Sequence, residues 1–107
     1  MTITFKDWNI EEMCGYKPKT TFYMDFSIAD KFGIKAIKDT YKNAFNFWKG
    51  DYEYLTELVM VMSWKSFEHI ENVELCKLYS DLYYKTDSYA LKHLKGDELT
   101  YYIRTTD

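Results

Sequence analysis

Proline, glycine and cysteine are scarce in this chain of 107 residues, which holds one proline, four glycines and two cysteines. The glycines are scattered, so they form no glycine-rich loop through which backbone amides approach a phosphate, and the GxGxxG and P-loop motifs are excluded. The GxSxG turn of serine hydrolases is absent as well. Cys14 and Cys76 form neither a zinc-type CxxC pair nor a disulfide framework. The sequence therefore offers no standard nucleotide, hydrolase or zinc motif.

Long apolar runs are also missing. The longest is LVMVM at residues 58–62, whereas a helix needs roughly 20 apolar residues to cross a membrane. The first residues, MTITFKDWNI, lack the basic and apolar regions of a secretory signal. Together with the lack of a disulfide framework, these features predict a cytoplasmic protein that does not enter a membrane.

Aromatic side chains, in contrast, are abundant, at 20% of the residues. A chain of this length and composition predicts a single globular domain, residues 1–107. Residues 1–21, which contain the only proline, are expected to be an irregular lead-in. Charge is uneven, because residues 17–50 carry a net charge of +4 and residues 51–107 a net charge of −5. Such asymmetry favours a polar partner or self-association.

Apolar residues recur at the three- and four-residue spacing of helices through most of the chain. Gly33, Gly50 and Gly96 follow such segments, and a glycine ends a helix readily because it adopts positive φ. The predicted helical segments cover residues 23–32, 34–48, 51–71 and 72–95. The sequence thus predicts an all-α protein, a small helical bundle of about four helices.

The stretch between residues 51 and 95 contains neither glycine nor proline, yet its apolar pattern shifts by nearly half a turn. The first stripe contains Leu55, Val59, Met62 and Ser66, and the second contains Leu75, Leu78, Leu82, Thr86, Tyr89 and His93. We therefore expect a break near Glu71 and Asn72. Asp51 and Asn72 are the expected N-caps of the two helices.

The two ends of the chain have a different composition. TITF at residues 2–5 and TYYIRTT at residues 100–106 are rich in β-branched and aromatic residues, which predicts short β-like segments that pair as a ribbon. A final helix that begins at Asp97 is the competing prediction.

The segment from Leu58 to Trp64 is apolar nearly all round. Such a helix is either the central element of its bundle or has one face covered by another subunit. Because few residues are available to surround it, we expect a homodimer.

Groups with metal or nucleophile chemistry are few: Cys76, His69 and His93. The Glu-x-x-His motif of di-iron bundles is excluded, because Ser66 and Ala90 stand three residues before the two histidines. Structural roles are expected for the cysteine and the histidines. No catalytic, cofactor-binding or metal-binding residue is predicted, and the protein is not expected to be an enzyme.

Carboxylates occur in pairs one helical turn apart, Glu53 with Glu57 and Glu68 with Glu71. General acid–base catalysis requires such pairs to be desolvated in a cleft. These residues lie opposite the apolar stripe or at a helix end, so we expect them to face solvent.

A resemblance to small uncharacterised proteins encoded by phages, prophages and integrative elements of Firmicutes is carried by FSIADKFGIKAIKDTYKNAFNFWKGDYEYLTELVMVMSWK and LYSDLYYKTDSYALKHLKGDELTYYIRTTD. The likeness extends from about Phe22 onward and rests on the overall pattern. It implies a bacterial or phage cytoplasmic accessory protein. It implies no chemistry, and no functional residues transfer with it.

These observations favour a non-enzymatic module that binds or modulates a protein partner. Tyrosine provides a large, rigid contact area with a polar tip, and the charge around the tyrosines near residue 84 is mainly negative, which disfavours nucleic acid. The candidate partner-binding residues are Lys35, Lys38, Lys42, Trp64, Tyr83 and Tyr84.

The alternative is a DNA-binding regulator that uses a helix-turn-helix-like segment at residues 27–45. Ala29, Gly33 and Ile34 fit that pattern, and lysines occupy the outer face of its second helix. Against it, Asp39 stands where the pattern buries an aliphatic residue, and no Arg or Gln is present there to read bases.

Overall fold

The computed structural model describes residues 21–106, and all regular structure in this part of the chain is helical. The helices are α2 (Thr21–Asp30), α3 (Ile34–Trp48), α4 (Tyr52–Glu68), α5 (Val73–His93) and α6 (Asp97–Thr106). The predicted all-α class is therefore confirmed, and the four predicted segments correspond to α2 through α5. The expected lead-in lies outside the described residues except for Thr21, which begins α2.

The C-terminal β-like segment was predicted wrongly, because residues 100–106 belong to α6. The competing prediction of a helix from Asp97 is confirmed. Asp97 and Glu98 lie in its first turn, where carboxylates favour a helix N-terminus. Tyr102 is buried against α4 and α5, and this packing outweighs the β propensity of the side chains. The other half of the predicted ribbon, residues 2–5, lies outside the described residues.

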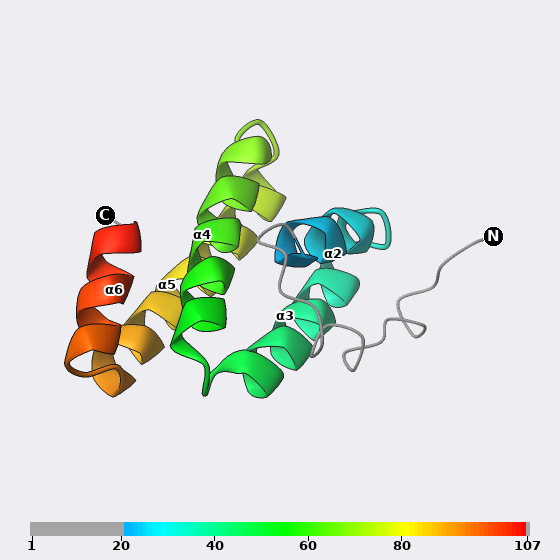
Figure 1. The fold of residues 1–107 in the computed structure, drawn as a ribbon. Helices are drawn as coiled ribbons and strands as arrows, with labels where there is room; N and C mark the ends of the chain where they lie inside the picture. The colour runs from blue at the N-terminus through cyan, green and yellow to red at the C-terminus, as the bar shows by residue number, and fades with distance from the viewer. Residues whose placement is uncertain (1–20, 107) are drawn as a thin grey trace.

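Helix α4 is the central element of the described fold. It contacts each of α2, α3, α5 and α6, and Figure 1 shows α5 alongside it, with α2 and α3 on one side and α6 on the other. Its buried residues occupy most of its circumference: Tyr54, Leu55, Thr56, Leu58, Val59, Val61, Met62 and Lys65. The chain itself thus covers most of the segment that is apolar nearly all round, with Trp64 left exposed, so its apolar circumference is largely explained without a second subunit. The homodimer stays a prediction.

The helix boundaries follow the expected capping chemistry. The Asp51 side chain accepts hydrogen bonds from the backbone amides of Glu53 and Tyr54, and the Asn72 side chain accepts one from Leu75. The predicted break between α4 and α5 at residues 69–72 is confirmed. It allows the two helices to pack side by side as the most extensive helix pair of the described fold.

Of the three glycines expected to end helices, two have positive φ, but Gly96 does not end its helix, because α5 ends at His93 with Leu94 as its C-cap and Gly96 lies just before α6. Gly33 has φ 103° and Gly96 has φ 61°. Gly50 follows α3 within a turn but does not adopt positive φ. The turn after α3 is therefore one that an L-residue can form.

Two clusters of buried side chains make up the core, and α4 contributes to both. The first joins α2, α3, α4 and α5, and the second joins α4, α5 and α6. The buried residues of α5 are Tyr79, Leu82, Thr86 and Ala90. The predicted stripe was therefore partly wrong, since Leu75, Leu78 and Tyr89 are half-buried and His93 is exposed. In the part of the chain described, no helix has the length and apolarity needed to span a bilayer.

Candidate functional site

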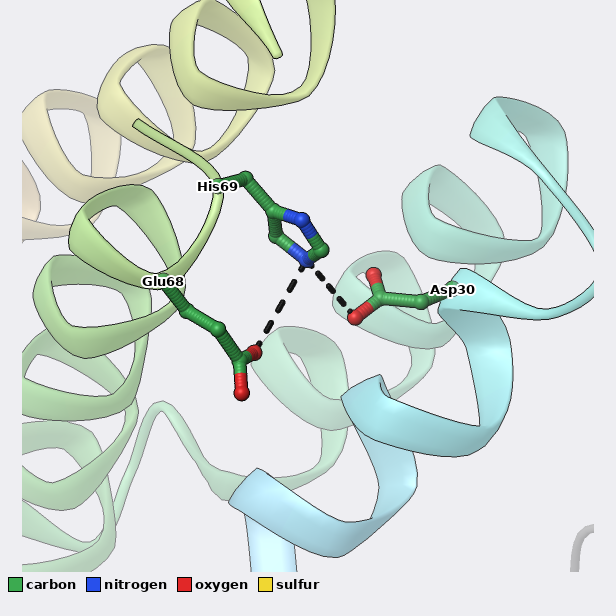
Figure 2. Close-up of side chains that lie close together, drawn as sticks. All are labelled: Asp30, Glu68 and His69. Carbon is green, nitrogen blue, oxygen red and sulfur yellow. Dashed lines mark hydrogen bonds and ion pairs between the residues drawn. The ribbon is translucent and has the colours of Figure 1, made fainter. Parts of the chain in front are cut away.

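A cluster of titratable side chains lies where the C-terminal ends of α2 and α4 meet. Asp30 is the last residue of α2, Glu68 is the last of α4, and His69 caps α4. Figure 2 shows the three side chains converging, and their ligand atoms lie within 4.8 Å of one another. Histidine and carboxylates are common metal ligands, so this corner is the natural place to look for a metal centre.

The cation between the carboxylates is, however, an ammonium group of the protein. Lys65 is only 1% exposed, and its Nζ lies 2.5 Å from Asp30 Oδ2 and also contacts Glu68 Oε2. It lies 3.2 Å from Ser27 Oγ as well. A lysine ammonium has three hydrogens to donate, and these three oxygens account for all of them.

The rings of two tyrosines complete the surroundings of the ammonium group. Nζ of Lys65 lies 5.0 Å from the ring centroid of Tyr23 and 5.9 Å from that of Tyr79. These distances fall within the range of cation–π attraction. The buried charge therefore has both hydrogen-bond and aromatic partners, which is the condition under which a lysine is tolerated in a core.

Each carboxylate oxygen of the cluster also has a protein partner. Tyr79 donates its hydroxyl to Asp30 Oδ1 at 2.5 Å, and Tyr23 donates to Glu68 Oε1 at 2.5 Å. His69 Nε2 lies 2.9 Å from Asp30 Oδ2, which Lys65 also contacts. A metal ion would have to displace the Lys65 ammonium to reach these oxygens. The arrangement is that of an ion-pair network that joins α2, α4 and α5.

The pKa directions agree with this structural role. Burial disfavours the charged form of Lys65, but the hydrogen bonds to Asp30 and Glu68 and the negative charges of these two groups together outweigh burial and raise the pKa of the ammonium group. The hydrogen bond from Lys65, and then that from Tyr23, lowers the pKa of Glu68. Burial, together with the hydrogen bond to Asp30, raises the pKa of Tyr79. These shifts move all three groups away from neutral pH, opposite to the tuning of a general acid or base.

Sequence reasoning did not identify Lys65, Asp30 or Tyr79. The signal available was a lysine inside the apolar segment VMSWKSF, because a charge on an apolar face requires a partner. The partners lie on other helices, and residue spacing does not reveal them. Glu68 is exposed, as predicted, and both of its carboxylate oxygens are paired.

The three described side chains with metal or nucleophile chemistry each contact different residues. The His69 ring stacks on Tyr79 with centroids 5.7 Å apart, and the exposed His93 stacks on Tyr89 at 4.1 Å. Cys76 is half-buried, with its Sγ 3.5 Å from Ser66 Oγ. Cys14 lies outside the described residues. Packing accounts for the positions of these three described side chains.

An exposed aromatic surface lies across α4 and α5. We define it by Trp64, Phe67, Tyr83 and Tyr84, with three serines between them: Ser63, Ser66 and Ser80. Phe67 is 72% and Tyr84 66% exposed. A hollow of ≈ 300 Å³ lies among these side chains, and one of ≈ 200 Å³ lies between Trp64, Tyr83 and the last residues of α6, Thr105 and Thr106. The structure thus brings together three of the predicted partner-binding residues, and it adds Phe67, which sequence reasoning missed.

The predicted lysines lie elsewhere, on α3. Lys38 and Lys42 line a groove of ≈ 610 Å³ between α3 and α5, where Lys85 joins them. We call this the α3–α5 groove. Lys35 lies outside its lining and pairs with Asp39 at 3.0 Å, with 90% of the lysine side chain exposed. Five of the six candidate partner-binding residues therefore divide between two separate surfaces, and Lys35 belongs to neither.

Comparison of the chain with protein-family models, with curated proteins and with solved structures found no match in any of the three. What the protein does is therefore inferred from the two surfaces and the ion-pair network.

Proposed function

We propose that this protein is a non-enzymatic interaction module, an accessory protein of a phage or mobile element that binds a protein partner in the bacterial cytoplasm. The observation that carries the proposal is the aromatic surface. Tyr, Trp and Phe are enriched at protein interfaces, and charged residues are depleted from interface centres. The residues that line the two hollows of this surface include no charged side chain.

The serines of the aromatic surface fit the same role. Ser66 Oγ lies 2.8 Å from Ser80 Oγ, which links α4 to α5 beneath the exposed rings. Tyr83 and Tyr84 contact each other edge to face, with centroids 5.2 Å apart. Rigid aromatic side chains lose little conformational entropy on binding. A second copy of the chain is one candidate partner, since an uncharged surface does not repel itself.

The test compares three forms of the tagged, full-length chain as baits in bacterial lysate. The first is the wild type, the second carries Phe67→Ser and Tyr84→Ser, and the control carries Leu91→Ser and Ile103→Ser, which are also exposed apolar residues. We expect the wild type and the control to capture the same protein and the aromatic-surface variant to lose it. Light scattering during size exclusion then shows whether that partner is a second copy.

Two results would refute the proposal. One is equal capture by all three forms, and the other is capture of nucleic acid in place of protein. All four substituted side chains are exposed, so we expect each variant to keep its helices. Circular dichroism of each variant checks this.

DNA binding is the second candidate function, and one observation favours it. Helices α2 and α3 are joined by a short turn at residues 31–33, and Lys35, Lys38 and Lys42 are exposed on α3. Asp39 pairs with Lys35 at 3.0 Å, so it holds one of these lysines away from a phosphate. Replacement of the three lysines by glutamate abolishes a duplex gel shift if this candidate is correct. The absence of any shift with the wild type would end it.

A further inference from the structure

The α3–α5 groove has a composition unlike that of the aromatic surface. Its volume of ≈ 610 Å³ falls in the range of ligand sites. Three lysines line it, Lys38, Lys42 and Lys85, and each is exposed. None of the three lysines forms an ion pair with another residue in the described part of the chain. Nζ of Lys85 lies 5.6 Å from the ring centroid of Tyr41, within the range of cation–π attraction. The groove therefore presents three exposed ammonium groups that form no ion pair with a described carboxylate.

The floor of the groove is apolar and firmly held. Tyr41 is buried, its hydroxyl lies 2.5 Å from Thr86 Oγ1, and its ring stacks on Phe45 with centroids 5.7 Å apart. Leu78 and Leu82 line the α5 side. Because these side chains are held by the core, the groove exists before a ligand arrives and binding requires little reorganisation.

Two carboxylates also line the groove, and they restrict the ligand. Asp39 is paired with Lys35, which lies outside the lining. Asp81 adds a negative charge on the α5 side. A polyphosphate backbone would bring a continuous line of negative charge past these aspartates, whereas a peptide carries separate carboxylates that can be positioned at the lysines. The balance of charge thus favours an acidic peptide over nucleic acid.

The groove and the aromatic surface lie on different sides of α5. Leu78, Leu82 and Lys85 belong to the groove, and Tyr83 and Tyr84 belong to the aromatic surface. At 100° per residue the two sets are separated by about half a turn of the helix. A ligand in the groove therefore leaves the aromatic surface free.

We infer that the α3–α5 groove is a second binding site, which takes an acidic peptide segment carrying one large apolar side chain. The apolar side chain packs on Phe45 and Leu78 at the floor, and flanking carboxylates pair with Lys38, Lys42 and Lys85. This site is independent of the aromatic surface. A protein with both surfaces is able to hold two partners at the same time.

The test uses the full chain and a short fluorescein-labelled peptide in which one leucine is flanked on both sides by glutamates. A matched peptide has glutamine in place of each glutamate. Fluorescence anisotropy measures binding by the wild type, by a groove variant (Lys38→Gln, Lys42→Gln, Lys85→Gln) and by a charge-matched control (Lys77→Gln, Lys92→Gln, Lys95→Gln). All six lysines are exposed, so both variants are expected to fold.

The acidic peptide is expected to bind the wild type and the control alike, and the groove variant about tenfold more weakly, as expected for the loss of three exposed ion pairs. The glutamine peptide is expected to bind more weakly than the acidic one. Amide NMR shifts on addition of peptide should centre on Phe45, Leu78 and Leu82. The Phe67→Ser, Tyr84→Ser variant retains peptide binding, which separates this site from the proposed function.

Several outcomes would overturn the inference. These are an absence of peptide binding by the wild type, an equal loss in the charge-matched control, and equal binding of the glutamine peptide. A duplex DNA that displaces the peptide from the same lysines with higher affinity would also overturn it and would support the DNA-binding alternative.

Discussion

At the scale of single residues, Lys65 has the most unusual environment in the described chain. Its ammonium group is buried between two carboxylates, a serine hydroxyl and two tyrosine rings. Transfer of a charge out of water is costly, and its partners offset that cost only while all of them are present. The same groups that suggest a metal centre are therefore used to keep one lysine inside the protein.

Replacement of Lys65 by methionine is expected to lower the free energy of unfolding by about 3 kcal/mol, because it leaves Asp30 and Glu68 facing each other without a cation. Urea denaturation followed by circular dichroism measures the change. Lys35→Met is the matched control. It breaks an exposed pair with Asp39 and is expected to cost less than about 1 kcal/mol. Equal costs for the two variants would contradict the structural role of the network.

Tyr79 is expected to make stability depend on alkaline pH. Its pKa in the folded protein is raised above the ordinary value of 10.0, by burial first and by the hydrogen bond to Asp30 second. A group whose folded pKa is raised contributes stability that is complete below its unfolded pKa and is lost as pH rises above that value. Unfolding free energy should therefore fall above pH 10.0.

The free energy of unfolding of the Tyr79→Phe variant should decline less steeply over the same alkaline range. At neutral pH the variant is expected to be less stable than the wild type, because Asp30 loses a hydrogen-bond donor. Denaturation series at neutral and alkaline pH compare the slopes of the two proteins. An identical slope in both would show that ionisation of Tyr79 is not linked to folding.

At the scale of elements, the local sequence predicts the helices and their caps, except where tertiary packing outweighs local propensity. Asp51 and Asn72 cap α4 and α5 as their side chains predict. In α6, β-branched and aromatic residues form a helix because Tyr102 enters the core and its hydroxyl donates to Asp87 on α5. Helix and strand propensities differ by only a fraction of a kcal/mol per residue, so one buried aromatic side chain outweighs them.

The turn between α2 and α3 depends on Gly33, whose φ of 103° and ψ of −174° are open essentially to glycine alone. Gly33→Ala is expected to destabilise the protein by about 1–3 kcal/mol, because alanine is strained in this conformation. Gly50→Ala is the control, since Gly50 lacks positive φ and an added Cβ there meets no atom within 4 Å. Thermal unfolding of both variants provides the comparison. A cost at Gly50 as large as that at Gly33 would contradict this account of the turn.

At the scale of the whole molecule, α4 and α5 each contribute buried residues to both core clusters. The first cluster contains Leu58 and Met62 on one side of α4, and the second contains Leu55 and Val59 on another. Because both clusters depend on the same helix, loss of one removes support from the other. The described part of the chain should unfold as one cooperative unit.

Tyr102→Ala tests this cooperativity. The substitution removes a buried side chain of the second cluster and is expected to cost about 3 kcal/mol or more. Circular dichroism and the fluorescence of Trp48, which lies in the first cluster, should still report a single coincident transition at lower denaturant. The measurement is made in a background that carries Trp8→Phe and Trp64→Phe, so that Trp48 is the only tryptophan and its fluorescence is observed alone. Two separated transitions would show that the clusters are independent.

Local patterns predicted the helical segments, but they predicted only some of the residues that line the aromatic surface and the α3–α5 groove. Lys38 and Lys42 were expected on an outer face of α3, but their neighbour Lys85 comes from α5. Trp64, Tyr83 and Tyr84 were expected to be available, and Phe67 joins them through the packing of α4 on α5. Spacing along a helix shows which residues share a face, whereas it does not show which faces meet.

The sequence by itself determined the helical class, the capping residues and the break between α4 and α5, because these depend on side chains within a few residues of one another. Only the tertiary structure decided that Lys65 is a buried ion and that Asp30, Ser27 and Tyr79 are among its neighbours. Asp30 and Tyr79 are 49 residues apart, and Ser27 and Lys65 are 38 apart. Such contacts form when helices pack, and their energies depend on burial and on partners that no local pattern contains.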